Sequence, residues 1–212
     1  MHIYWLGEGC FKFQSGETTV VIDPYPKDIG LKPPRTKADI AIMSNPKSNG
    51  IESVSGDYFL INGPGEYEVK GVFVYGVGLD SVSENNGKKG EETTTIYRIE
   101  AENISVAHLD GLNKSLNNRE LEKLENVDVL VIPVGGGDVL VAKKAVEIIN
   151  QVEPRVVIPM KYKLPKLKRK YDPVDNFLKE MHATKIKPLS KYIVKKKDLP
   201  QDKTDIILLE QS

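Results

Sequence analysis

The sequence predicts a single α/β domain that spans residues 1–212. Residues 1–100 contain short β-rich runs separated by turns, whereas the second half alternates buried strands with amphipathic helices. A chain of 212 residues with 40% hydrophobic residues is also long enough to bury a sizeable core. These observations favour one fold of mixed α and β structure over two small domains.

The first elements are short strands joined by glycine-containing turns. We expect antiparallel strands at residues 3–6, 10–13 and 19–22. Asp23-Pro24 ends this series, because proline removes a donor from the ladder of hydrogen bonds. A loop over residues 27–37 leads to an apolar run at 40–43, which is followed by polar residues that favour turns. This pattern indicates a buried strand that delivers a loop to a cleft.

The middle of the chain continues with strands at residues 58–61, 65–69 and 72–75. Glu66 and Glu68 alternate with Tyr67 and Val69, so one side of that strand should face solvent. The polar residues 81–92 have no periodicity and predict a mobile loop or flap. Two further strands, at 94–100 and 103–107, lead to His108.

The second half predicts alternating strands and helices. Asn118 or a neighbour should cap a helix that runs to residue 124, and Asp138 should cap a helix over 142–152. A third helix should begin at Asp172-Pro173. The expected strands of this half cover residues 127–134, 156–160, 191–194 and 205–209. The second helix is preceded by three glycines, Gly135, Gly136 and Gly137, without a Walker or dinucleotide-binding pattern. This segment is either a loop that binds phosphate or an ordinary connecting loop.

The charge of the chain is zero overall but unevenly distributed. Residues 1–154 carry 15 basic against 23 acidic residues, and residues 155–203 carry 15 against 5. The basic region is either a solvated surface, a surface that pairs with the acidic part, or one that faces an anionic partner. Nucleic acid is the weaker candidate partner, because the basic stretch of this region lacks interleaved aromatic residues on which bases could stack. The residues of that stretch are Lys163, Lys166, Lys168, Arg169 and Lys170.

The cysteine count and hydropathy bear on the compartment. A single cysteine, Cys10, excludes an intrachain disulfide and indicates a reducing compartment. The N-terminus lacks the pattern of a secretory signal, and no apolar run reaches about 18 residues. We therefore expect a cytoplasmic protein without a membrane partner. The sequence leaves open whether it forms a homo-oligomer.

Several motifs resemble the metallo-β-lactamase superfamily, especially its lactonase-like branch of bacterial zinc-dependent hydrolases. They are Ile3-Tyr4-Trp5-Leu6-Gly7, Val21-Ile22-Asp23-Pro24, Asn62-Gly63-Pro64-Gly65-Glu66-Tyr67 and Val157-Ile158-Pro159-Met160-Lys161-Tyr162. The resemblance implies a four-layer αβ/βα sandwich, with helices outside two packed sheets and a shallow cleft at the sheet edges. It also implies metal-assisted hydrolysis, with zinc or another divalent metal as cofactor.

The metal-ligand positions of that family are substituted in this sequence. In the family a strand ends in Ser/Thr-His-x-His-x-Asp-His, and here Ser44 keeps the first position while Asn45, Lys47, Asn49 and Gly50 occupy the ligand positions. An amide is a poor zinc ligand, an ammonium group repels a dication, and glycine has no side chain. This loop therefore does not predict a metal cage.

Two later family motifs are also altered. The family has His-Leu-Gly-Asp-Leu-Gly where this chain has His108, Asp110 and Gly111, so the carboxylate stands one residue early. On an extended segment that shift should turn the carboxylate of Asp110 to the opposite side. Lys161 replaces the histidine of the family's Ile-Pro-Met-His-Tyr. We therefore expect no cofactor.

The leading hypothesis is a pseudoenzyme that binds a ligand or scaffolds a complex through a cationic cleft. If Lys47 and Lys161 share that cleft, they hold a small anionic ligand or form internal ion pairs, with Asp23 as the first partner and Asp110 as the second. One alternative is a hydrolase of lactones, esters or phosphodiesters with metal-free or atypical-metal chemistry. Another is a weak nucleic-acid or polyanion binder that uses the basic stretch. No catalytic residue stands out, and the candidate ligand-binding residues are Asp23, Asn45, Lys47, Asn49, His108, Asp110 and Lys161.

Overall fold

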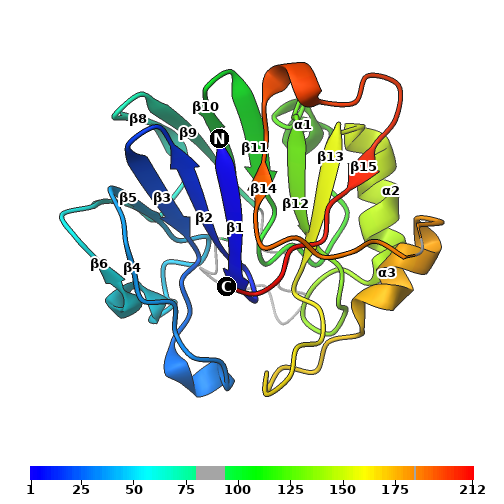
Figure 1. Cartoon of the computed structure of the whole chain (residues 1–212), viewed down its shortest axis with the longest axis horizontal. Helices are drawn as coiled ribbons and strands as arrows, with labels where there is room; N and C mark the ends of the chain where they lie inside the picture. Colours follow the sequence, from blue (N-terminus) through cyan, green and yellow to red (C-terminus); the bar gives the residue numbers. More distant parts are fainter. Residues whose placement is uncertain (80–93, 184) are drawn as a thin grey trace, which may run out of the picture.

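Two β-sheets packed face to face form the centre of the fold (Figure 1). The structure is a computed structural model, and it describes residues 1–79, 94–183 and 185–212. The main hydrophobic core lies between the sheets and includes fully buried Phe11, Phe13, Ile99 and Val106. Because alternate residues of a strand point to opposite faces, each sheet contributes one apolar face to this core.

The first sheet has the strand order β14-β1-β2-β3-β5-β7. The pairs β1/β2 and β2/β3 are antiparallel, as the glycine-containing turns predict, whereas β3, β5 and β7 run parallel. The strands are β1 (His2–Gly7), β2 (Cys10–Ser15), β3 (Thr18–Ile22), β5 (Ile40–Ile42), β7 (Phe59–Ile61) and β14 (Tyr192–Ile193).

The second sheet has the order β15-β13-β12-β11-β10-β9-β8, and a small separate sheet pairs β4 with β6. Glu66 and Glu68 on β8 are exposed, as their alternation predicts. The strands of the second sheet are β8 (Gly65–Val69), β9 (Val72–Gly78), β10 (Thr95–Ala101), β11 (Ile104–His108), β12 (Val129–Pro133), β13 (Val156–Met160) and β15 (Asp205–Ile206). Those of the small sheet are β4 (Thr36–Lys37) and β6 (Val54–Ser55).

The α-helices are α1 (Asn118–Glu122), α2 (Ala142–Val152) and α3 (Val174–Glu180), and the 3₁₀ helices are η1 (Lys27–Ile29), η2 (Gly50–Ser53) and η3 (Lys196–Asp198). Asn117 caps α1 with a reciprocal bond to Glu120. The expected cap of α2 by Asp138 is wrong, because the chain makes a further turn and Val141 occupies the N-cap position. The carboxylate of Asp138 accepts a hydrogen bond from Arg169 instead.

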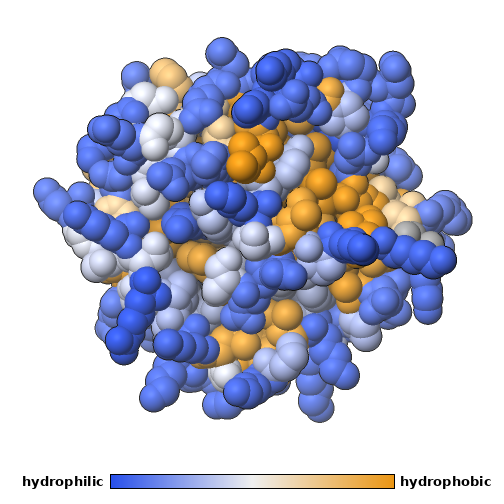
Figure 2. Space-filling view, in the orientation of Figure 1, coloured by the Kyte–Doolittle hydropathy of each residue, from blue (hydrophilic) through white to orange (hydrophobic). Residues whose placement is uncertain are grey.

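The outer layers differ between the two sheets. Helices α2 and α3 lie beside the second sheet in Figure 1, whereas η1 and the small sheet lie at the opposite side of the molecule. A second apolar cluster, which includes Leu6, Val21, Tyr25 and Leu31, covers the outer face of the first sheet. The α/β sandwich is therefore confirmed, with a thinner outer layer over the first sheet. Hydrophilic side chains cover most of the face seen in Figure 2, with apolar patches between them.

Three remaining expectations concern segments. The flap expected at residues 81–92 lies outside the described residues. Among the described residues, no helix is long and apolar enough to cross a membrane. The strands expected at residues 191–194 and 205–209 are present but shortened to two residues each, as β14 and β15.

Candidate functional site

Polar residues gather where strands of both sheets end. Glu8 follows β1, Asp23 follows β3, Lys161 follows β13, and His108 is the last residue of β11. Glu8, Asp23 and Lys161 all have φ between 47° and 55°, in the left-handed region that non-glycine residues seldom adopt. The backbone therefore turns sharply at three strand ends and brings these side chains into one buried cluster.

Lys161 is at the centre of this cluster. Its Nζ lies 2.9 Å from Oδ1 of Asp110 and 3.4 Å from Oε1 of Glu8, and its side chain is only 7% exposed. Burial disfavours the charged form of Lys161, but the carboxylates of Asp110 and Glu8 outweigh burial and raise its pKa. The ammonium group is therefore charged and internally paired. Asp23, which we expected as the first partner, forms no ion pair with Lys161 among the described contacts.

Glu8 is the residue of this cluster that sequence reasoning missed. The hydroxyl of Tyr171 donates to its Oε1 over 3.3 Å, and Nε of Arg169 lies 3.6 Å from the same oxygen. The backbone N–H of Gly9 donates to the other oxygen, Oε2. The sequence shows Glu8 between two glycines, which marks a turn, but no pattern indicates that its side chain points inward.

Asp23 and Ser44 form the second part of the cluster. The backbone N–H of Ser44 donates to Oδ1 of Asp23 over 2.6 Å, and its hydroxyl donates to Oδ2 over 2.7 Å. Burial, and next the negative charge of Asp110, raise the pKa of Asp23 well above its usual value. These hydrogen bonds connect the end of β3 to the loop that begins two residues after β5.

His108 completes the cluster and is completely buried. Its Nε2 lies 2.9 Å from the carbonyl oxygen of Gly9, and since a carbonyl can only accept, Nε2 carries the proton. Nδ1 faces Oδ2 of Asp23 at 3.5 Å and has no hydrogen-bond partner in the described structure. Burial lowers the pKa of His108 to about 3, so the ring is neutral at physiological pH.

Asp110 points toward the cluster, which corrects the expectation that its carboxylate turns away. β11 ends at His108, and Leu112 donates its N–H to the carbonyl of Leu109, so Asp110 lies in a turn where the alternation of a strand does not apply. A Cβ placed on Gly9 would lie 2.3 Å from Oδ1 of Asp110. The glycine thus leaves room for this carboxylate.

The loop after Ser44 contributes no buried side chain. Asn45, Lys47 and Asn49 are exposed, and Oδ1 of Asn45 accepts a hydrogen bond from the backbone of Lys47. A Cβ placed on Gly50 would lie only 1.6 Å from the carbonyl oxygen of Pro24. No side chain fits there without a backbone shift. Lys161 is buried and Lys47 is exposed, and a cleft shared by the two amines stays a prediction.

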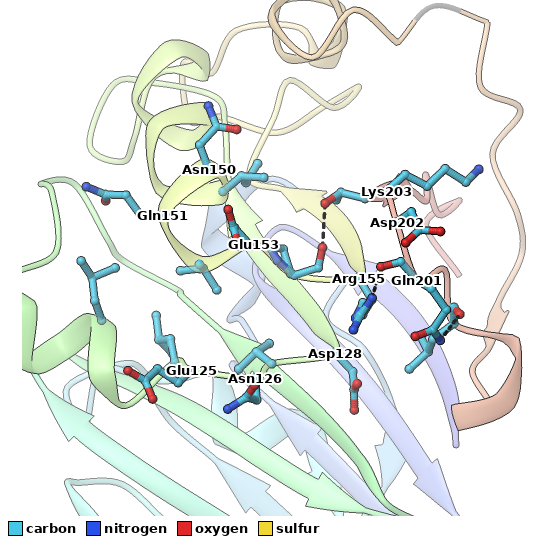
Figure 3. A pocket seen from close by; sticks show the side chains of 18 of the residues that line it. Glu125, Asn126, Asp128, Asn150, Gln151, Glu153, Arg155, Gln201, Asp202 and Lys203 are labelled. Carbon is cyan, nitrogen blue, oxygen red and sulfur yellow. Dashed lines mark hydrogen bonds between the residues drawn. The ribbon is translucent and has the colours of Figure 1, made fainter.

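The other predicted residues lie on the surface. Lys163, Lys166, Lys168, Arg169 and Lys170 are all exposed. A cavity of about 1070 Å³ elsewhere contains none of the predicted site residues, and Glu125, Asn126, Glu153 and Arg155 are among the residues that line it (Figure 3). The guanidinium of Arg155 donates there to the carbonyls of Pro200 and Gln201.

This chain is similar to several known proteins, two of which are named as hydrolases. A crystal structure from Thermotoga maritima, assigned to the Zn-dependent hydrolases of the metallo-β-lactamase superfamily, has 28% identity, covers 99% of each chain and has a TM-score of 0.81. The UPF0173 metal-dependent hydrolase of Methanopyrus kandleri is 25% identical over 76% of this chain and 84% of its own. A UPF0173 protein of Pyrococcus abyssi is 26% identical over 76% of this chain and 83% of its own.

These names correct the expectation of no cofactor. Relatives that are named metal-dependent and Zn-dependent hydrolases point to a divalent metal cofactor for the family, so that expectation is wrong.

The side chains described in this chain do not match a family cage. No group of three or more His, Cys, Asp or Glu side chains in the described residues is arranged to hold a metal ion. An ammonium group neutralises Asp110, and the backbone of Pro24 closes the space beside Gly50.

The extent of the sequence match shows to which family this chain belongs. The strands from β1 to β13 and the cluster between them fall in one continuous stretch of chain. The beta-lactamase superfamily domain matches residues 2–161, which begin with the first residue of β1 and end at Lys161. Because this match covers most of the chain, the protein belongs to the beta-lactamase superfamily.

Proposed function

We propose that this protein acts by binding rather than by hydrolysis, with the hydrolytic centre of the fold replaced by a structural ion-pair cluster. The observation that supports this proposal is the position of the Lys161 ammonium group between the carboxylates of Asp110 and Glu8. A buried charge costs several kcal/mol unless it is paired, so these three groups require one another.

The paired groups are poorly suited to acid–base catalysis. A general base must reach the proton that it removes, directly or through one water molecule. Lys161, Asp110 and Asp23 are each at most 9% exposed, and His108 is completely buried. The proton on Nε2 of His108 is held by a backbone carbonyl. A substrate would have to open the cluster before any of these groups could touch it.

The relatives make hydrolysis the activity to test. The purified protein should be assayed with lactone, ester and phosphodiester substrates, with Zn²⁺ and Mn²⁺ supplied because relatives are named metal-dependent hydrolases. We expect no turnover above the buffer rate with any substrate. Asp110→Asn is the matched variant, because it keeps the size of the side chain and removes its charge.

The proposal fails if the wild-type protein turns over a substrate and Asp110→Asn abolishes that turnover. Circular dichroism of the variant must then show that it is folded, so that loss of activity is not loss of structure.

A further inference from the structure

A second polar site lies beside the cluster, in a groove of about 770 Å³ between residues 25–37 and 49–55. The two strands of the small sheet, β4 and β6, contribute Thr36, Lys37 and Ser55 to its lining. Its charged lining residues are Lys27, Lys32, Arg35, Lys37 and Glu52. Four cations against one carboxylate leave a formal charge of +3 in one concave surface.

These cations form no ion pair within the described residues. Lys27, Lys32, Arg35 and Lys37 are all exposed, and none of them forms an ion pair with a carboxylate in the described part of the chain. Some basic residues elsewhere do form ion pairs: Lys70 pairs with Asp39, for example. A cleft lined by one sign of charge focuses its field and concentrates counter-ions. An anion is therefore the ligand that this groove attracts.

The basic stretch of the second half lies against the turn at Ile29 and Gly30, which connects the groove residues Lys27 and Lys32. The backbone N–H of Lys168 donates to the carbonyl of Ile29 over 2.9 Å. A Cβ placed on Gly30 would lie 2.2 Å from the carbonyl oxygen of Lys166 and 3.1 Å from Cγ of Lys168. Two basic segments that lie far apart in the sequence thus meet at one turn, which extends the positive field beyond the groove lining.

We propose that this groove binds a small molecule that carries two or more linked phosphate groups. A formal charge of +3 balances a diphosphate, and a volume of about 770 Å³ is within the usual range of about 300–1,000 Å³ for small-ligand sites. The guanidinium of Arg35 has the planar geometry that pairs with two phosphate oxygens at once. Among the described residues that line the groove, Tyr25 is the only aromatic one, and it is 4% exposed, so recognition rests on phosphate rather than on stacking of a base.

This inference goes beyond the proposed function and does not depend on it. The groove shares no residue with the ion-pair cluster of Lys161, Asp110 and Glu8. Hydrolysis by that cluster would refute the proposed function and leave binding in the groove unaffected.

The test is calorimetric titration of the full-length protein with inorganic pyrophosphate, orthophosphate, ADP and AMP. We expect pyrophosphate and ADP to bind at least about tenfold more tightly than orthophosphate and AMP, because two linked phosphate groups can pair with more of the four cations at once than a single phosphate group can. Affinity for pyrophosphate alone identifies an inorganic ligand, and tighter binding of ADP identifies an organic diphosphate. Both affinities should fall as salt rises from about 0.05 to about 0.5 M.

The decisive variant is Lys32→Gln/Arg35→Gln, matched with Lys195→Gln/Lys197→Gln. All four residues are exposed, and both double variants remove two positive charges, but Lys195 and Lys197 are outside the groove lining. The groove variant should weaken pyrophosphate binding about tenfold, and the control should stay within about twofold.

Three outcomes would overturn the inference. They are no binding of pyrophosphate or ADP by the wild-type protein, equal weakening by both double variants, and binding of a single-stranded RNA oligonucleotide in the absence of pyrophosphate binding. The last outcome would assign the surface to nucleic acid.

Discussion

Removing the charge of Lys161 should strongly destabilise the fold. In Lys161→Met the side chain keeps similar length and apolar volume, but the carboxylates of Asp110 and Glu8 lose the ammonium group that lies 2.9 and 3.4 Å away. At an effective dielectric constant of about 20, the closer pair alone attracts by about 6 kcal/mol before the cost of desolvation. Breaking a buried pair by removing one partner typically costs about 3–5 kcal/mol, and we expect a loss of that size.

Urea denaturation at neutral pH measures this loss as a change in the free energy of unfolding. Lys144→Met is the matched control, because Lys144 pairs with Glu147 at 2.7 Å on the surface of α2, where both side chains are about half exposed. Such a pair contributes about 0.3–0.5 kcal/mol. The reasoning is refuted if Lys161→Met unfolds within about 1 kcal/mol of the wild-type protein, or no more easily than Lys144→Met.

Two further predictions concern His108 and Gly50. Burial lowers the pKa of His108 from 6.5 to about 3, so between these values the unfolded state binds more protons and stability falls as the pH falls. Urea melts should lose about 2 kcal/mol between pH 6.5 and pH 5 through this residue, and an unchanged pH slope in His108→Phe would contradict the assignment. Gly50→Ala should cost at least about 2 kcal/mol in the same assay, because its Cβ would overlap the carbonyl of Pro24. Gly63→Ala, whose Cβ meets nothing within 4 Å, should be nearly neutral; equal losses would refute the steric argument.

The order of strands and helices was predictable because hydrophobic periodicity is a local signal. The strand expected at residues 156–160 appears as β13 with the same bounds, and all five of its residues are buried. The cap of α2 was not predictable in this way. Asp138 has the right residue type and precedes the helix, but its carboxylate pairs with Arg169, which lies 31 residues further along the chain.

The candidate site was predictable only in part. Asp110 was the second candidate partner of Lys161, and the structure pairs them, although the expected outward direction of the Asp110 carboxylate was wrong. Glu8 was missed because its inward direction depends on a backbone turn with φ of 55° between two glycines, which sequence alone does not orient. The cofactor was predicted wrongly from substituted ligand positions, whereas the names of the relatives point to a divalent metal. The substituted residues are those at the family's metal-ligand positions. Their substitution concerns that one site and does not exclude a metal bound by other residues.

The central claim is that Lys161 and Asp110 form one structural unit, and a double-mutant cycle tests it most directly. The cycle compares the free energies of unfolding of the wild-type protein, Lys161→Met, Asp110→Asn and the double variant. Lys161→Met leaves the Asp110 carboxylate without the ammonium group, and Asp110→Asn leaves Lys161 with Glu8 alone, so the double variant should be more stable than the sum of the two single losses predicts. We expect a coupling energy of at least about 2 kcal/mol. Additive losses, with a coupling energy within about 0.5 kcal/mol of zero, would contradict the claim.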